Sequence, residues 1–285
     1  MSALSPPSAP EYAMTALLPL LVEPAALEAS LGNEALLIID LCQTQTWRQL
    51  HIPGAVHLNP AELVSGIPPA SGSLPELSQL NRLFSRIGYR PDLHIVAYDD
   101  EGGGWAARLL WTLDVIGHTR YSLLNGGLHS WYKEQHPVTQ EIRQCEVTIT
   151  NLVLHPEPVA EFDAVLAALK DPGIKIWDAR SAEEYAGLRS GSARAGHIPG
   201  AVNLDWLELM DREHNLRLLP AEALQNKLEA VGIRNNDHII THCQSHHRSA
   251  LSYFVARYLG YAAKGYHGSW GEWGNLPDAP IELMA

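Results

Sequence analysis

The residues of this chain best suited to chemistry form one short segment, Cys243-Gln244-Ser245-His246-His247-Arg248. A cysteine that loses its proton is a strong nucleophile, and its reactivity depends on how far its surroundings favour the thiolate. Arg248 adds a permanent positive charge, which favours an anion nearby. The segment therefore predicts a cysteine nucleophile, Cys243, that acts on an anionic substrate.

The sequence on both sides of this segment predicts the elements that hold it. Residues 238–242 (His-Ile-Ile-Thr-His) are mostly apolar or β-branched, which predicts a short buried strand. After the segment, apolar residues recur at helical spacing through residues 251–259. A cysteine between a strand end and a helix start faces converging backbone N–H groups and the positive end of the helix dipole. Both favour the thiolate, and both can hold an anion.

Composition bounds the class of protein. The 285 residues are 46% hydrophobic and 18% charged, which predicts a globular chain of about two domains. A net charge of −12 argues against nucleic acid or an anionic membrane as a partner, so a bound anion must be attracted locally. Three cysteines are too few for a disulfide framework, and the chain start does not resemble a secretory signal. We expect a cytoplasmic protein whose residues 1–10, rich in proline and serine, are disordered.

The chain contains an internal repeat. The run His-Ile-Pro-Gly-Ala-Val at residues 51–56 recurs at residues 197–202, an offset of 146 residues. Each copy alternates short apolar runs with helical patterns, which predicts an α/β domain with a largely parallel sheet and helices on both faces. We place the two domains at residues 17–137 and 159–280, joined by a proline-containing linker at residues 138–158. The repeated run itself is expected to be an architectural turn.

The two copies differ at the position of the nucleophile. Asp99 in the first copy corresponds to Cys243 in the second, and the loop Asp-Asp-Glu-Gly-Gly-Gly at residues 99–104 has no arginine. Its three acidic residues would repel an anionic substrate. We therefore expect the second domain to be catalytic and the first to be a degenerate copy.

These motifs together resemble the tandem-domain rhodaneses, or sulfurtransferases. The resemblance covers about residues 17–277 and rests on the doubled His-Ile-Pro-Gly-Ala run, Asp178-Ala179-Arg180, the Cys-x4-Arg loop and the Gly-Ser-Trp-Gly-Glu-Trp ending. The loop is most similar to those of certain bacterial thiosulfate sulfurtransferases. It lacks the Arg-Lys-Gly of vertebrate-type rhodaneses and the Gly-Ser-Gly series of mercaptopyruvate sulfurtransferases. Glu184 stands where the vertebrate-type enzymes have a substrate-binding arginine.

The resemblance implies a two-step covalent reaction without a cofactor. The Cys243 thiolate attacks the outer sulfur of thiosulfate, sulfite leaves, and the resulting persulfide gives its sulfur to cyanide, a cellular thiol or a sulfur-accepting protein. The rest of the loop would surround the small anionic donor, with the two histidines as hydrogen-bond donors to its sulfonate end. That loop comprises Gln244, Ser245, His246, His247 and Arg248.

Three residues outside the loop are candidates for a supporting layer. Arg180 either pairs with Asp178 or faces the site, and Trp206 either walls the pocket or packs in the core. Cys42 and Cys145 are expected to be packing residues. We expect no metal, because adjacent histidines in a tight loop point apart, and we expect a monomer.

Other functions remain open from the sequence. Mercaptopyruvate is an alternative donor. A phosphatase of the His-Cys-x5-Arg type is a second alternative, with Asp211 or Glu208 as its acid, although this loop is one residue shorter. A non-catalytic module that docks a sulfur-carrier or another protein is a third. Turnover with thiosulfate and cyanide would distinguish these functions.

Overall fold

The first sequence copy folds around a five-stranded sheet in which every pairing is parallel. The structure is a computed structural model and describes residues 16–284, so the tail expected to be disordered lies outside the described residues. The strand order is β1-β5-β4-β2-β3. The strands are β1 (Leu21–Val22), β2 (Leu36–Asp40), β3 (Val56–His57), β4 (His94–Tyr98) and β5 (Tyr121–Leu124).

Helices cover both faces of this sheet, because successive strand residues point to opposite faces and both faces are apolar. One face packs against α3 and α4, and the other against α1, α2 and α5. The helices are α1 (Pro24–Glu28), α2 (Thr44–Gln49), η2 (Pro60–Leu63), α3 (Leu77–Arg86), α4 (Gly104–Val115) and α5 (Gly127–Lys133).

The second copy repeats this architecture with the equivalent strand order, β6-β12-β11-β7-β8. A short antiparallel pair, β9 (Met210–Asp211) with β10 (Arg217–Leu218), is added outside the sheet. The predicted pair of α/β domains with largely parallel sheets is confirmed. The strands are β6 (Val159–Ala160), β7 (Ile174–Asp178), β8 (Val202–Asn203), β11 (His238–His242) and β12 (Ala262–Tyr266). The helices are α6 (Phe162–Ala168), α7 (Ala182–Tyr185), η3 (Trp206–Leu209), α8 (Ala221–Ala230), α9 (Arg248–Tyr258) and α10 (Ser269–Trp273).

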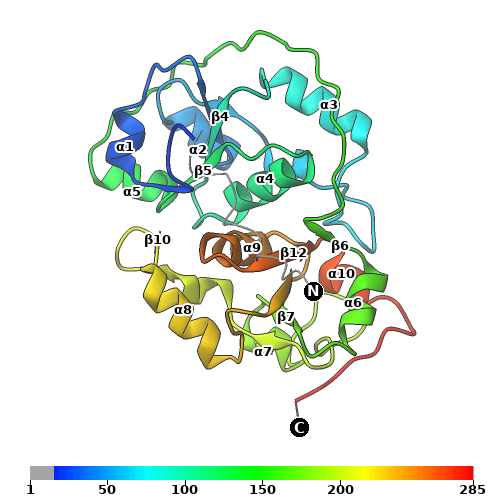
Figure 1. Ribbon diagram of the computed structural model, residues 1–285. Coiled ribbons are helices and arrows are strands. Elements are labelled where there is room, and N and C mark those ends of the chain that lie inside the picture. The colour runs from blue at the N-terminus through cyan, green and yellow to red at the C-terminus, as the bar shows by residue number, and fades with distance from the viewer. Residues whose placement is uncertain (1–15, 285) are drawn as a thin grey trace, which may run out of the picture.

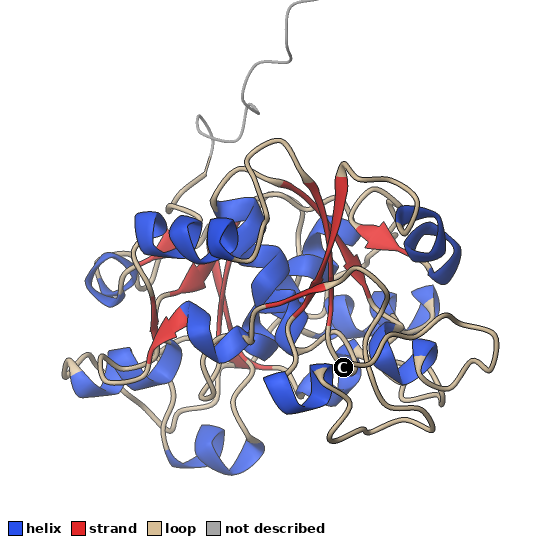
Figure 2. Ribbon diagram, turned by 90° about the horizontal axis from the view of Figure 1, so that it is seen from below, coloured by secondary structure: helices blue, strands red, loops and turns tan. Residues whose placement is uncertain are grey.

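The two domains meet where α4 packs against α9 (Figure 1). Seen from below, the strands lie between helices (Figure 2). Both helices are buried almost all round, because each lies between its own sheet and the other domain. The Tyr253 hydroxyl on α9 donates to Asp114 on α4 at 2.8 Å, and one apolar cluster runs through both domains. Since each helix directly follows the loop after a central strand, the Asp99 loop and the Cys243 loop both lie near this interface.

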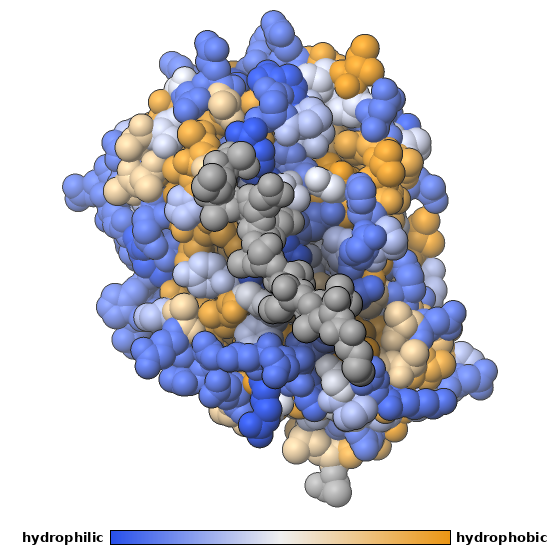
Figure 3. Space-filling view, viewed as in Figure 1, coloured by the Kyte–Doolittle hydropathy of each residue, from blue (hydrophilic) through white to orange (hydrophobic). Residues whose placement is uncertain are grey.

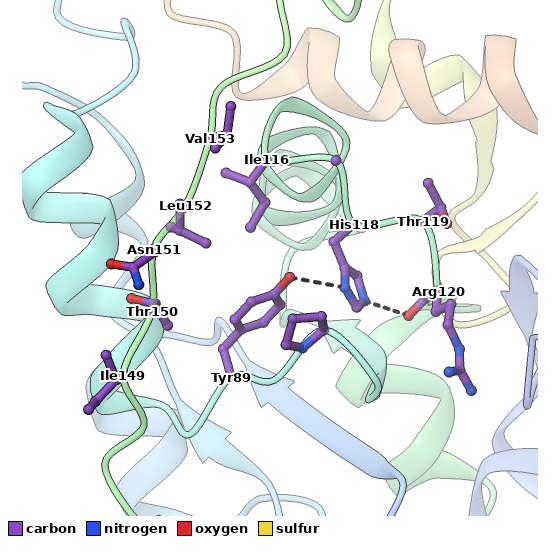
Figure 4. A pocket seen from close by; sticks show the side chains of 12 residues that line it. Tyr89, Ile116, His118, Thr119, Arg120, Ile149, Thr150, Asn151, Leu152 and Val153 are labelled. Carbon is purple, nitrogen blue, oxygen red and sulfur yellow. Dashed lines mark hydrogen bonds between the residues drawn. The ribbon is translucent and has the colours of Figure 1, made fainter.

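The segment expected to be a linker follows the surface of the first domain. Thr148 and Thr150 donate hydrogen bonds to the carbonyls of Tyr89 and Asn81, at 2.9 and 2.8 Å. A cavity of about 330 Å³ lies between residues 149–153 and the first domain, beside His118, whose ring contacts the Tyr89 hydroxyl (Figure 4). This cavity does not include the Cys243 loop.

The repeated His-Ile-Pro-Gly-Ala runs have the same structural role in both domains. His51 forms an isolated antiparallel bridge with Thr139, and His197 forms one with Glu282. Each run is thus bonded to the segment that follows the last helix of its domain.

The face seen in Figure 3 is a mixture of hydrophilic and hydrophobic residues. Within residues 16–284, no helix combines the length and apolar character needed to cross a membrane.

Candidate active site

Cys243 lies between β11 and α9, where the sequence places it, and its sulfur faces hydrogen-bond donors. Burial by itself raises the pKa of the Cys243 thiol. The charge of Arg248, the hydroxyl of Ser249 and the backbone amides of Ser249 and Ser245 outweigh burial, so the pKa lies below its ordinary value. The side chain is only 1% exposed. The site therefore favours a shielded thiolate held by directed donors.

Helix α10 turns the loop so that its amides face inward. The amides of Trp270 and Gly271 donate to the carbonyls of Cys243 and Gln244, both at 2.9 Å. The amides of Cys243 and His246 donate to the Ser269 hydroxyl, at 3.3 and 3.0 Å, so the amides that act on the sulfur are those of Ser245 and Ser249. The first domain also contacts the loop, because Gly72 lies so close to the Ser245 backbone that a Cβ there would clash.

Arg248 is held by Glu184 in a two-pronged ion pair, with N–O distances of 2.6 and 2.9 Å. Burial works against the Glu184 carboxylate, but the contact with Arg248 outweighs it and lowers the pKa of Glu184 to about 2. Glu184 thus fixes the loop arginine in place. Arg248 still acts on Cys243 through its charge.

Gln244 points away from the sulfur. Its Nε2 donates to the Ser192 hydroxyl at 3.1 Å, and its side chain packs against Gly191. Ser245 contributes to the site through its backbone amide. Gln244 therefore contributes to the site without placing its side chain at the thiolate.

The two loop histidines lie in different surroundings. His246 is fully buried, adopts a left-handed backbone with φ 53°, and packs edge-on against Trp111 of α4. His246 therefore faces the domain interface. Donation to a sulfonate would require it to face the open side of the site. Burial lowers the pKa of His246, and the charge of Arg108 lowers it further.

His247 lies at the partly open side, between residues of both domains. Its ring stacks on Trp105 with centroids 4.3 Å apart, and its Nε2 contacts the Glu101 carboxylate. Trp206 of η3 lies 5.6 Å from the same ring and packs against the apolar core as well. Trp206 therefore packs against the core beside His247, and its role as a wall of the pocket stays a prediction.

Arg180 pairs with Asp178. Both side chains are fully buried, and Arg180 Nη2 lies 2.6 Å from Asp178 Oδ2. The guanidinium also lies 4.3 Å above the ring of Trp270. Strand register places Asp178 beside His242, at 3.5 Å, and burial lowers the pKa of His242 to about 4. This buried cluster supports the loop from beneath and does not face the sulfur.

In the first domain, a carboxylate occupies the corresponding cradle. Asp99 accepts hydrogen bonds from the amides of Glu101, Gly103 and Ala106 at 3.1, 2.8 and 2.9 Å. Amides that could hold a thiolate are thus occupied by a side chain of the loop itself. This geometry explains how the first domain keeps the loop shape without a nucleophile.

Three residues near the nucleophile are absent from the sequence-based set: Ser249, Arg108 and Glu101. Ser249 follows Arg248 at the start of α9, so the helix pattern could have predicted its position near the sulfur. Arg108 is signalled only as a positive charge in a largely apolar helix. Glu101 belongs to the acidic loop at residues 99–104, but no local pattern places it beside His247. Within residues 16–284, no group of three or more His, Cys, Asp or Glu side chains is arranged to hold a metal ion.

Comparison with known proteins identifies the class. The model of the Rhodanese-like domain matches twice, at residues 23–134 and 161–276. The chain belongs to the rhodanese-like family and carries two copies of its domain. It is 47% identical to a thiosulfate sulfurtransferase of Azotobacter vinelandii, covering 93% of this chain and 98% of that protein. It is 44% identical to a thiosulfate sulfurtransferase of Pseudomonas aeruginosa, with the same coverage.

A solved structure shares the whole architecture. The crystal structure of SseA from Escherichia coli, described as a 3-mercaptopyruvate sulfotransferase, superposes with a TM-score of 0.78 at 27% identity. The match covers 88% of this chain and 98% of SseA. The tandem arrangement of two rhodanese-like domains is therefore shared over nearly the full length of both chains.

Proposed function

We propose that this chain is a thiosulfate sulfurtransferase in which Cys243 carries the transferred sulfur. One observation carries the proposal: Cys243 is the cysteine whose surroundings lower its pKa, through directed amides, a hydroxyl and an arginine. The other two cysteines differ. Burial raises the pKa of Cys42, and it also raises that of Cys145. The identity to two thiosulfate sulfurtransferases over nearly the whole chain supports thiosulfate as the donor.

The first step forms one sulfur–sulfur bond and breaks another. The Cys243 thiolate attacks the outer sulfur of thiosulfate, and the electron pair of the cleaved S–S bond leaves with sulfite. The enzyme retains a persulfide anion. Because the negative charge stays within the reach of the loop, the donors that stabilise the thiolate can also stabilise the persulfide.

The second step returns the enzyme to its starting state. A thiophilic acceptor, cyanide or a cellular thiol, attacks the terminal sulfur of the persulfide, and the Cys243 thiolate leaves. With cyanide the product is thiocyanate. No cofactor is needed, since both steps are displacements at sulfur. A sulfur-accepting protein as partner, a monomeric state and a cytoplasmic location remain predictions.

Small molecules would reach the thiolate from the side formed by Trp105, Trp206 and His247. His247 is the loop histidine partly open to solvent, so we propose it as the donor toward the sulfonate. Its side chain is 19% exposed. His246 is excluded from that role by its burial against Trp111.

Mercaptopyruvate is the second candidate donor, supported by the shared architecture with SseA. The phosphatase alternative has less support. Its candidate acids are engaged elsewhere, since Asp211 pairs with His214 and Glu208 with Lys227. The docking alternative for the second domain is weakened by the lowered pKa of Cys243.

Mass spectrometry of the intact protein tests the proposal. After treatment with thiosulfate, the wild-type chain is expected to gain the mass of one sulfur atom and to lose it on addition of cyanide. Cys243→Ser should gain none, and the matched control Cys42→Ser should behave as the wild type does. Uptake of sulfur by Cys243→Ser would refute the assignment. Turnover measured with thiosulfate and with mercaptopyruvate then identifies the preferred donor.

A further inference from the structure

Arg108 is a buried positive charge in α4 of the first domain, a largely apolar helix whose other charged residue is Asp114. Its side chain is fully buried in α4, and within residues 16–284 it forms no ion pair with a carboxylate. Burying a charge without a counter-charge costs free energy, so we expect such a residue to have a structural or functional role. The guanidinium lies 4.7 Å from the ring of Trp111 and donates to the carbonyl of Leu63 at 2.9 Å.

The same guanidinium reaches across the interface to the Cys243 loop. Arg108 Nη1 donates to the carbonyl of His246 at 3.3 Å. His246 has the left-handed backbone, which is uncommon for a residue other than glycine. Its N–H donates to the Ser269 hydroxyl at 3.0 Å. The backbone of this residue is therefore held from both sides, by α10 of its own domain and by α4 of the other.

The His246 side chain continues the path toward the nucleophile. Its Nδ1 lies 2.8 Å from the hydroxyl of Ser249, and that hydroxyl is one of the groups that lower the pKa of the Cys243 thiol. A hydroxyl that donates to a thiolate must accept from the imidazole, which places the ring proton on Nδ1. Within residues 16–284, Nε2 of His246 has no hydrogen-bond partner, as fits its unprotonated state. Burial and the charge of Arg108 both lower the pKa of His246, so the ring is neutral.

We propose that Arg108 of the first domain is a positioning residue for the nucleophile of the second, acting through His246 and Ser249. Arg108 fixes the His246 carbonyl, His246 orients the Ser249 hydroxyl, and Ser249 stabilises the negative sulfur. The charge of Arg248 lowers the pKa of Cys243, and the negative Cys243 in turn raises the pKa of Arg108 against the effect of burial. The inference rests on the proposed role of Cys243 as nucleophile.

In this role of Arg108, the degenerate first domain contributes to the active site of the second. With the two copies aligned, Gly104 corresponds to Arg248 and Arg108 corresponds to Ser252. The first domain thus lacks the arginine at the helix start and carries one a turn later, directed across the interface. The domain that has lost its own nucleophile supplies a charge to the other.

The principal test is Arg108→Met, read by ultraviolet titration of the thiolate with Cys243→Ser as the blank. We expect the Cys243 titration to move to higher pH. Sulfur loading from thiosulfate in a single turnover is expected to slow about tenfold near neutral pH, equivalent to about 1.4 kcal/mol. Tyr253→Phe is the matched control, because it removes a hydrogen bond between the same two helices without touching the loop. If Arg108→Met leaves the thiolate titration unchanged, or if Tyr253→Phe shifts it equally, the role of Arg108 is only structural and the proposal fails.

Variants of His246 test the path itself. His246→Asn keeps a side-chain donor and tolerates the left-handed backbone, whereas His246→Gly keeps only the backbone. We expect His246→Asn to titrate near the wild type and His246→Gly to resemble Ser249→Ala. In the double variant, the effects of His246→Gly and Ser249→Ala should not add, since both interrupt one path. Additive effects would overturn the proposal. These variants also test the path if Arg108→Met fails to fold.

Failure of this inference and failure of the proposed function give different results. The thiolate titration needs no substrate. A wild-type protein that takes no sulfur from thiosulfate would refute the proposed function, whereas an unshifted thiolate in Arg108→Met would refute the positioning role alone.

Discussion

Replacing Glu184 by glutamine tests how the loop arginine is held. Glu184→Gln preserves the size of the side chain and removes the charge that binds Arg248 at 2.6 and 2.9 Å. The arginine would then lie in a largely buried place without its counter-charge, since its side chain is 20% exposed. Removing one partner of such a pair is destabilising because the other stays desolvated.

The pKa of Glu184 provides the magnitude. The contact with Arg248 overcomes burial and holds this pKa at about 2, against an ordinary value of 4.5. A difference of about 2.5 pKa units corresponds to about 3 kcal/mol, an upper bound because solvent reaches part of the pair. A lowered carboxyl pKa contributes its full stability above about pH 4.5 and loses it as the pH falls toward about 2. We therefore expect Glu184→Gln to lose about 2–3 kcal/mol near neutral pH.

Urea unfolding at two pH values measures this difference. The gap in unfolding free energy between wild type and Glu184→Gln should be full at about pH 7 and much smaller at about pH 3, where the wild-type pair is itself weakening. The exposed neighbour provides a matched control, Glu183→Gln, which is expected to leave the unfolding free energy nearly unchanged. A gap that is absent at about pH 7, or equally large at about pH 3, would refute the reasoning. The pKa of Cys243 should fall in Glu184→Gln, because the charge of Arg248 is no longer compensated.

Three further changes have directions set by the structure. Asp99→Ala leaves three amides without an acceptor and should lower the unfolding free energy by about 3 kcal/mol in urea, with a smaller loss for Asp99→Asn. Arg180→Met removes a cation beside Asp178 and His242, so the pKa of His242 should rise from about 4. NMR titration of the His242 imidazole measures this pKa, and an unchanged value would contradict the prediction. Glu101→Gln removes a negative charge in contact with His247, so kcat/KM for thiosulfate should rise about threefold at low salt and converge with wild type at high salt.

The sequence determined the duplication, the α/β domains and the position of the nucleophile. These features depend on short-range information: the periodicity of apolar residues, the repeated His-Ile-Pro-Gly-Ala run, and the order strand, Cys243, helix. Alignment of the two copies also predicted that Asp99 replaces the nucleophile. It could not predict that the Asp99 carboxylate accepts hydrogen bonds from the loop amides, because a sequence gives residue types but not the direction of backbone N–H groups.

Only the tertiary structure decided which groups surround the loop. His246 and His247 are adjacent and of one type, yet one is buried against Trp111 and the other is partly exposed beside Glu101. The difference comes from a left-handed backbone at His246 and from contacts with the first domain. Arg108 is 138 residues from His246 in the chain, and Glu101 is 146 residues from His247. Such contacts are made by the packing of α4 against α9, which no local pattern of residues encodes.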